Sequence, residues 1–391
     1  MYTDQVPSQM ENVLIATVLS FVITYFAIPV LIRVAELKHL YDEPDERKSH
    51  KSRIPTLGGI AFFSGFIVAT AVCVPALADS PFQYMVAAFF VIFMVGMKDD
   101  IVGLTPLKKL IGQLMASFAV IYLSNLQISS MYGFLGFNAL PPHFSLLLTY
   151  FTFLVVINAF NLIDGVDGLA GSVGMLVSGV LGTYFLYTGQ LVYAVLGFSM
   201  AGGLAAFLIY NISPARIFMG DTGSLLVGLV NAILTIKFIE VAGNPAGKLP
   251  VESVPAVAIA ILILPLFDTM RVFAVRMLHG RSPFAADRNH LHHYLLALNL
   301  NHRQTTLVCV VVNAAYIAFA FYFQHIGTGW LLACMIGFAL MLTGILYQLK
   351  KRKETMLHKI NLATLNDAKA VVEVMPKSAI RVNPKGVLQD K

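Results

Sequence analysis

The sequence contains few charged residues for its length. Asp, Glu, Lys and Arg make up 12% of its 391 residues, and 57% of the residues are hydrophobic, whereas soluble domains carry about 25% charged residues. This composition argues against a soluble multidomain protein. Because long apolar runs recur from one end of the chain to the other, we expect an all-α polytopic membrane protein.

Cysteine is also scarce. Cys73, Cys309 and Cys334 fall in separate apolar runs, so they indicate neither a disulfide framework nor a metal-binding motif. The first apolar run has no basic region before it and no small-residue cleavage site after it. We therefore expect a retained span rather than a signal peptide.

Apolar runs long enough to cross a bilayer predict about eleven transmembrane helices. The third run is short, and the ninth continues into an amphipathic extension. We expect a single transmembrane domain over 1–349 and a basic tail over 350–391. The predicted spans are 12–35, 58–78, 83–97, 108–124, 144–160, 169–187, 191–210, 222–241, 253–271, 305–325 and 329–349.

Basic residues are distributed unevenly among the gaps between these spans. All 27 Lys and Arg residues except Lys237 and Lys248 fall in, or at the edge of, alternate gaps or in the C-terminal tail. Basic residues favour the cytoplasmic side of a membrane. We therefore expect the N-terminus outside, the C-terminus in the cytoplasm, and an odd number of spans.

Polar residues recur at every third position where the fifth apolar run ends. They are Asn158, Asn161, Asp164 and Asp167. Residues three apart share a face of a helix, and the glycine after each acid lets the backbone turn tightly or approach a ligand. Acids at a membrane are costly, so they indicate function; the alternative is a polar loop joining two spans. Within this stretch we expect Asn158 to be structural.

Other carboxylates fall on the side that we expect to be cytoplasmic, namely Asp99, Asp100, Asp221 and Asp268. Two bare carboxylates about 4 Å apart repel by roughly 4 kcal/mol at an effective dielectric constant near 20. A divalent cation and basic side chains would compensate this repulsion. Oxygen donors favour Mg²⁺, or Mn²⁺, over Zn²⁺, and Mg²⁺ typically uses one or two protein groups plus substrate phosphates. Most of these acids therefore need not be ligands.

The last large loop on this side is rich in basic residues and histidine. This composition suits phosphate recognition, because Arg binds phosphate with two parallel hydrogen bonds. A zinc site and an ordinary solvated loop are the alternatives. The first loop on the same side offers weaker candidates for ligand binding, because its basic residues are equally explained as those that set the orientation of the chain in the membrane. The residues are Arg281, Arg288, His290, His292 and His293 in the last loop, and Lys48, His50 and Arg53 in the first.

Four sequence blocks stand in order along the chain: Lys98-Asp99-Asp100, Asn158 to Leu169, Phe218 to Ser224, and Asp287 to His293. Together they resemble the polyprenyl-phosphate N-acetylhexosamine-1-phosphate transferase family, which includes the phospho-MurNAc-pentapeptide translocase of peptidoglycan synthesis. The resemblance covers roughly residues 40–300. The form Arg-Ser-Pro-Phe at 281–284, followed by Asp-Arg-Asn-His-Leu-His-His, resembles the GlcNAc-1-phosphate branch; the run of three His followed by an acid, usual in the translocase branch, is missing.

The resemblance implies a role for each matching residue. Asp221 would be the principal Mg²⁺ ligand and Asn161 the second, while Asp99 and Asp100 would lie beside the lipid phosphate. Asp164 and Asp167 would hold the metal–pyrophosphate or nucleotide region. The remaining candidates are Asn211 and Phe218 for the uracil, Arg281, Arg288, His290, His292 and His293 for the pyrophosphate and sugar, and Lys48, His50 and Arg53 for the nucleotide.

The resemblance also implies a reaction and its place. A UDP-N-acetylhexosamine, most simply UDP-GlcNAc, would react with undecaprenyl phosphate to give a sugar-diphospho-undecaprenol and UMP, which initiates a lipid-linked cell-surface polysaccharide. Domain 1–349 would be catalytic and integral to the bacterial inner membrane. Its partners would include membrane lipid but no nucleic acid, and whether it forms a homodimer is left open. The active-site loops on the cytoplasmic face would be 36–57, 98–107, 161–168, 211–223 and 272–304.

Other functions remain to be distinguished. Peptidoglycan phospho-MurNAc-pentapeptide transfer is the alternative within the family, and a covalent phospho-aspartate route is an alternative mechanism. A cation-coupled transporter would place its acids near mid-membrane, whereas these fall at the ends of the spans. The Gly-x-Gly-Asp motif of an intramembrane aspartyl protease would need Gly where Phe218 stands.

Overall fold

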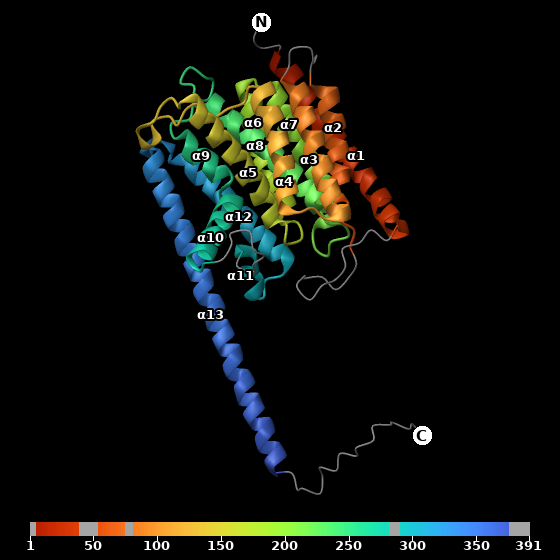
Figure 1. Cartoon of the computed structure of the whole chain (residues 1–391), viewed down its shortest axis with the longest axis vertical. Helices are drawn as coiled ribbons and strands as arrows, with labels where there is room; N and C mark the ends of the chain where they lie inside the picture. The colour runs from red at the N-terminus through yellow and green to blue at the C-terminus, as the bar shows by residue number, and fades with distance from the viewer. Residues whose placement is uncertain (1–4, 39–53, 75–80, 281–289, 375–391) are drawn as a thin grey trace. The chain divides into compact units, whose positions relative to one another are not determined.

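The computed structural model describes residues 5–38, 54–74, 81–280 and 290–374. Within these ranges the regular structure is helical, apart from isolated bridge residues at Ile54 and in the antiparallel pair Ser130 and Ala139. This confirms the all-α fold. The chain divides into two compact units, Met1–Leu340 and Met341–Lys391. The α-helices are α1 (Gln5–Lys38), α2 (Gly58–Cys73), α3 (Phe82–Val102), α4 (Pro106–Phe118), α5 (Pro142–Ile163), α6 (Leu169–Thr188), α7 (Leu191–Asn211), α8 (Gly220–Ala242), α9 (Val254–Ile261), α10 (Ile263–Leu278), α11 (Leu291–Ala297), α12 (His302–Tyr322) and α13 (Thr328–Val374) (Figure 1).

Each predicted span overlaps one helix or two consecutive helical segments, and residues 75–78 of the second predicted span lie outside the described residues. Among the described residues, seven helices are long and apolar enough to cross a membrane: α1, α5, α6, α7, α8, α12 and α13. The ninth predicted span differs, because α9 and α10 are bent by 85° where they meet. The number of crossings and the sides of the two termini remain predictions.

The break between α9 and α10 is closed by a side chain from α12. Asn313, which is fully buried, accepts a hydrogen bond from the backbone N–H of Leu264 at 3.1 Å and donates one to the carbonyl of Ile261 at 3.1 Å. A helix break inside apolar surroundings exposes backbone groups that need partners. The amide of Asn313 supplies them, which explains why an abrupt bend persists within an apolar sequence.

Helix α8 forms the centre of the first unit. Of the residues in its most apolar 18-residue stretch, 83% are buried, a larger share than in any other candidate span among the described residues. Helices α2, α3, α5 and α6 pack around it. Two glycines allow this close packing. Gly96 of α3 lies directly against the backbone of Thr222, and a Cβ on Gly228 would lie 2.6 Å from the Cα of Ile157. The C-terminal turns of α3 and α5 therefore meet the N-terminal turn of α8 at one end of the bundle.

Candidate active site

A tight turn brings α4 back alongside the end of α3. Gly103 ends α3 with a φ of 77°, and its N–H donates to the carbonyl of Asp99 at 2.9 Å. Pro106 starts α4, where its fixed φ suits the first turn of a helix. The N–H of Leu104 in this turn donates to Asp99 Oδ1 at 2.7 Å. The turn thus fixes the Asp99 carboxylate and places the first residues of α4 next to it.

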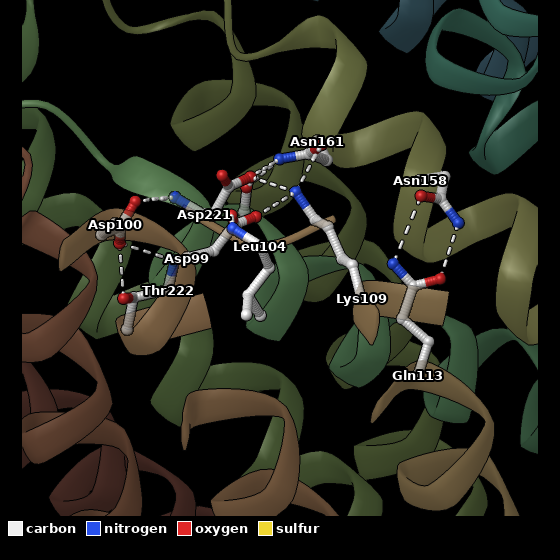
Figure 2. Close-up of polar contacts among 10 residues, drawn as sticks. Asp99, Asp100, Leu104, Lys109, Gln113, Asn158, Asn161, Asp221 and Thr222 are labelled. Carbon is white, nitrogen blue, oxygen red and sulfur yellow. Dashed lines mark hydrogen bonds and ion pairs between the residues drawn. The ribbon is translucent and has the colours of Figure 1, made fainter. Parts of the chain in front are cut away.

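The Lys109 ammonium, on the second turn of α4, lies among oxygens from three other helices (Figure 2). Its Nζ is 2.6 Å from Asp221 Oδ1 on α8, 2.9 Å from Asp99 Oδ2 on α3 and 3.4 Å from Asn161 Oδ1 on α5. Charge-assisted hydrogen bonds of this kind are stronger than neutral ones. Lys109 therefore joins four helices at one charged centre.

Asn161 completes this centre from the side of α5. Its amide nitrogen donates to Asp221 Oδ1 and, at 2.9 Å, to Ser224 Oγ, while its amide oxygen faces Lys109 (Figure 2). Sequence positions 161 and 221, which the family resemblance pairs as metal ligands, are thus in direct contact. The structure brings together Asp99, Asn161 and Asp221 from the predicted set.

Asp100 points away from Lys109, toward the start of α8. Its carboxylate accepts hydrogen bonds from the N–H of Asp221 at 2.7 Å, the N–H of Thr222 at 2.9 Å and the hydroxyl of Thr222 at 2.5 Å (Figure 2). The first N–H groups of a helix lack partners within the helix and carry partial positive charge. Asp100 therefore anchors the N-terminus of α8 and holds Asp221 in place.

A second polar pair lies one turn after Lys109 on α4 and about one turn before Asn161 on α5. The side-chain amides of Gln113 and Asn158 bond to each other in both directions, at 2.8 and 3.2 Å (Figure 2). Asn158 also donates to the carbonyl of Leu154 at 2.8 Å. Because this pair fixes the register of the two helices, it sets Lys109 opposite Asn161 and gives Asn158 a structural role.

The loop between α5 and α6 carries the other two predicted acids. Partial burial, followed by the charges of Asp221, Asp100 and Asp167, raises the pKa of Asp164 well above its usual value. Asp167 does not join the Lys109 centre. Its Oδ1 lies 3.2 Å from Nδ1 of His302, the first residue of α12.

The uracil candidates Asn211 and Phe218 both form hydrogen bonds with backbone groups of other residues. Asn211 is buried; its amide oxygen accepts from the N–H of Gly168 at 2.8 Å, and its amide nitrogen donates to the carbonyl of Ile217 at 2.8 Å. The N–H of Phe218 donates to the carbonyl of Pro55 at 2.7 Å. Asn211 thus ties the 164–168 loop to the segment that follows α7.

The histidines at the start of α11 form a compact cluster. His290 Nδ1 lies 2.9 Å from Asp268 Oδ2, and Asp268 also pairs with Arg271 at 3.0 Å. The ring of His292 is stacked on that of His290, with centroids 5.5 Å apart, and it contacts Gly165 in the loop after α5. His293 lies beside His292, with ring centroids 4.4 Å apart. Asp268 therefore orients this cluster toward the 164–168 loop.

The zinc alternative and five further candidates remain to be compared with the structure. Among the described residues, no group of three or more His, Cys, Asp or Glu side chains is arranged to hold a metal ion, so nothing in this part of the chain supports a zinc site at the histidines. The candidates Lys48, His50, Arg53, Arg281 and Arg288 lie outside the described residues.

Sequence reasoning missed Lys109, which it counted only as a topology signal. The signal was present, because Lys109, Gln113 and Ser117 recur at every fourth position of α4 and form a polar stripe along one face of the helix. It also missed His302, whose contact with Asp167 spans 135 positions of sequence.

Comparison with known proteins identifies the class. A profile described as glycosyl transferase family 4 matches residues 82–239, which include Asp99, Lys109, Asn161 and Asp221.

Individual relatives extend the match beyond that segment. A decaprenyl-phosphate N-acetylglucosaminephosphotransferase of Mycobacterium leprae is 31% identical over 83% of this chain and 86% of its own length. A probable undecaprenyl-phosphate N-acetylglucosaminyl 1-phosphate transferase of Bacillus subtilis is 29% identical over 78% of this chain and 83% of its own. An undecaprenyl-phosphate alpha-N-acetylglucosaminyl 1-phosphate transferase of Escherichia coli K12 is 28% identical, with 80% and 84% covered. The chain therefore belongs to the polyprenyl-phosphate N-acetylhexosamine-1-phosphate transferase family, as its motifs indicated.

Removing the Lys109 charge should destabilise the fold. In Lys109→Met, Asp99 and Asp221 would face each other without a cation, at a cost of about 2 kcal/mol or more. The adjacent Lys108 is exposed, so Lys108→Met is the matched control. We expect the midpoint of thermal unfolding in detergent to fall for Lys109→Met and to stay at the wild-type value for Lys108→Met. Equal midpoints for the two variants would contradict the role assigned to Lys109.

His292 should make stability depend on pH. Burial, and then the charge of His293, lowers the pKa of His292 from 6.5 to about 3. Below pH 6.5 the unfolded chain therefore binds a proton that the folded chain does not, and each further pH unit down to about pH 3 removes about 1.4 kcal/mol of stability.

The test compares unfolding midpoints between pH 7 and pH 5. His292→Gln should show a weaker loss of stability on acidification than the wild type, whatever its midpoint at pH 7. His143→Gln changes an exposed histidine and should keep the wild-type dependence. A His292→Gln variant with the full wild-type dependence would show that another group causes it.

Proposed function

We propose that this protein transfers N-acetylglucosamine 1-phosphate from UDP-N-acetylglucosamine to undecaprenyl phosphate and releases UMP. The observation that carries the proposal is the Lys109 centre, in which carboxylate and amide oxygens converge on a cationic nitrogen at the ends of apolar helices. A transferase that joins a lipid phosphate to a water-soluble nucleotide sugar needs such a charged centre at a membrane surface. The names of the curated relatives support a polyprenyl phosphate acceptor and an N-acetylglucosamine phosphate group.

The orientation is part of the same proposal. Lys98, Lys108, Lys109 and Arg303 belong to the basic set of gaps that predicts the cytoplasmic side. The active site would then face the cytoplasm of the bacterial inner membrane, with the N-terminus outside. UDP-sugars are made in the cytoplasm, so this orientation gives the site access to its donor.

The donor set of the centre fits Mg²⁺. The carboxylate of Asp221 and the amide oxygen of Asn161 are hard oxygen donors that both face Lys109 Nζ, and Mg²⁺ typically uses one or two protein groups together with substrate phosphates. Asp221 and Asn161 would hold the ion, whose chemistry is to neutralise the diphosphate and stabilise the departing UMP. The Lys109 ammonium already occupies a cationic position against the same oxygens, which supports a demand for positive charge at this point.

The protein's own residues would mainly position and neutralise the reacting groups. A lipid phosphate oxygen would attack the β-phosphorus of the donor, and the bond from this phosphorus to the bridging oxygen of UMP would break. Such transfers depend on positioning and charge stabilisation more than on covalent help from the protein. Lys109 would bind phosphate oxygen, and Asp99, fixed by Leu104 and Lys109, would orient the acceptor phosphate.

A general base is not required by this scheme. A phosphate monoester has a second pKa near 6, so the lipid phosphate is mostly dianionic at neutral pH and needs no proton removed. His292, whose pKa is lowered to about 3 in its buried position, would act there as a neutral hydrogen-bonding group rather than as a cation. The single-displacement route is therefore preferred here over a phospho-aspartate intermediate.

UMP release tests the proposed reaction directly. Purified protein with Mg²⁺, undecaprenyl phosphate and UDP-GlcNAc should release UMP and form a lipid-linked sugar diphosphate. A panel with UDP-GalNAc and UDP-MurNAc-pentapeptide as alternative donors identifies the sugar, and we expect the highest kcat/KM with UDP-GlcNAc. Absence of UMP with every UDP-N-acetylhexosamine would overturn the proposal, and a preference for UDP-MurNAc-pentapeptide would assign the alternative reaction.

Asp221→Asn tests the proposed metal site. The change keeps the size of the side chain but removes the charge, so turnover should fall by about 10²-fold or more. Mg²⁺ should also raise the unfolding midpoint of the wild type but not that of Asp221→Asn. Glu240→Gln, near the other end of the same helix, is the control and should behave as the wild type. Near-normal turnover of Asp221→Asn would refute the assignment.

A further inference from the structure

We propose that the first turn of α12 is a positioning element for the active-site loop 164–168, and that His302 acts by orienting the carboxylate of Asp167. The inference rests on the proposed function, because it assigns that loop to the side of the site that receives the UDP-sugar. His302 is a positioning residue in this scheme and does not itself contact the reacting atoms.

Two side chains of α12 hold Asp167 at different points. His302 Nδ1 accepts a hydrogen bond from the backbone N–H of Asp167 at 3.4 Å and lies 3.2 Å from Asp167 Oδ1. The Thr306 hydroxyl donates to the backbone carbonyl of Asp167 at 3.0 Å. Residues 302 and 306 are four apart, so they share one face of the helix. Together they fix both the backbone and the carboxylate direction of one acid. The side chains of His302 and Asp167 are mostly buried, at 18% and 7% exposed.

The same turn also holds the neighbouring loop. The Arg303 side chain donates from Nε to the carbonyl of Ser213, in the segment that Asn211 links to Gly168. Asn301 and Gln304 close the start of α12 through reciprocal side-chain to backbone hydrogen bonds, a capping box that fixes this turn. The 164–168 and 211–217 segments are thus tied to each other and to one rigid helix end.

The loop needs such support because of its own composition. It contains Gly165 and Gly168, which leave the backbone free to adopt many conformations, and Gly168 has a φ of 80°. It also places Asp164 near the negative charges of Asp221, Asp100 and Asp167, and these charges contribute to its raised pKa. Repulsion among acids on a flexible loop would move them apart. The contacts from α12 oppose that movement.

The position of the loop suggests which substrate depends on it. The loop contacts His292 through Gly165 and lies beyond the ends of the apolar helices α5 and α6. By contrast, α4, which carries Lys109, exposes Leu107, Ile111 and Met115, an apolar face suited to lipid. The water-soluble UDP-sugar would therefore approach from the side of the loop, and the lipid phosphate from the side of α4. A displaced Asp167 should weaken use of the donor.

The test measures KM for each substrate in the UMP-release assay. His302→Leu removes both the hydrogen bond that Nδ1 accepts from the N–H of Asp167 and the contact between Nδ1 and Asp167 Oδ1. Loss of one hydrogen bond corresponds to a change of about tenfold in affinity. We expect the KM for UDP-GlcNAc to rise about tenfold while the KM for undecaprenyl phosphate stays within twofold of the wild-type value. His302→Asn retains a side-chain amide, which can both accept and donate hydrogen bonds, near the position of Nδ1, and it should return the KM for UDP-GlcNAc most of the way to the wild-type value.

A pair of threonines supplies the matched control. Thr306→Val removes the hydroxyl that binds the carbonyl of Asp167 and should raise the KM for the donor. Thr305→Val removes the neighbouring buried hydroxyl, whose oxygen has no hydrogen-bond partner within the described part of the chain, and should leave both KM values unchanged. Unfolding midpoints of all four variants identify any that fail to fold; if His302→Leu does, Thr306→Val against Thr305→Val decides.

Each outcome bears on the inference. Unchanged donor KM in His302→Leu and Thr306→Val, or an equal rise in the KM of both substrates, would overturn the positioning role while the wild type still releases UMP. A wild type that releases no UMP would instead overturn the proposed function, and the inference with it. A rise in donor KM alone, restored by His302→Asn, supports the inference.

Discussion

The rest of the site depends on the ion pairs that Lys109 forms with Asp221 and Asp99. Its ammonium lies 2.6 Å from a carboxylate oxygen of Asp221 and 2.9 Å from one of Asp99, at the meeting point of helices that come from distant parts of the sequence. Without a cation these carboxylates would repel each other in surroundings where water screens charge poorly. A single positive charge therefore allows α3, α5 and α8 to bring their polar ends together.

Several structural contacts act by keeping that charge in place. The turn after Gly103 returns the chain so that α4 runs beside α3, and Gln113 with Asn158 fixes the register of α4 against α5. Asp100 anchors the start of α8 and thereby Asp221. The polar groups of the site are thus divided between those that face the charged centre and those that hold its supporting helices. A transferase of this family needs both kinds, since phosphoryl transfer depends largely on positioning.

Local patterns predicted much of the fold but less of the site. Apolar runs located the helices, and the spacing of Asn161 and Asp164 placed both residues at one helix end. The bend between α9 and α10 was missed because it depends on Asn313, which lies 49 and 52 positions along the sequence from the two residues it binds, Leu264 and Ile261. The role of Asp100 was missed because it arises from the N-terminus of another helix. Lys109 and His302 were missed because their partners, Asp221 and Asp167, are distant in sequence and only tertiary packing brings them into contact.

A double-mutant cycle between Lys109 and Asp221 tests the central claim most directly. It compares the free energies of unfolding of the wild type, Lys109→Met, Asp221→Asn and the double variant. If one ammonium compensates adjacent carboxylates, Asp221→Asn should relieve much of the loss caused by Lys109→Met, with a coupling free energy of about 1 kcal/mol or more. Additive effects, within about 0.3–0.5 kcal/mol, would contradict the account, because they would mean that Lys109 and Asp221 do not stabilise each other.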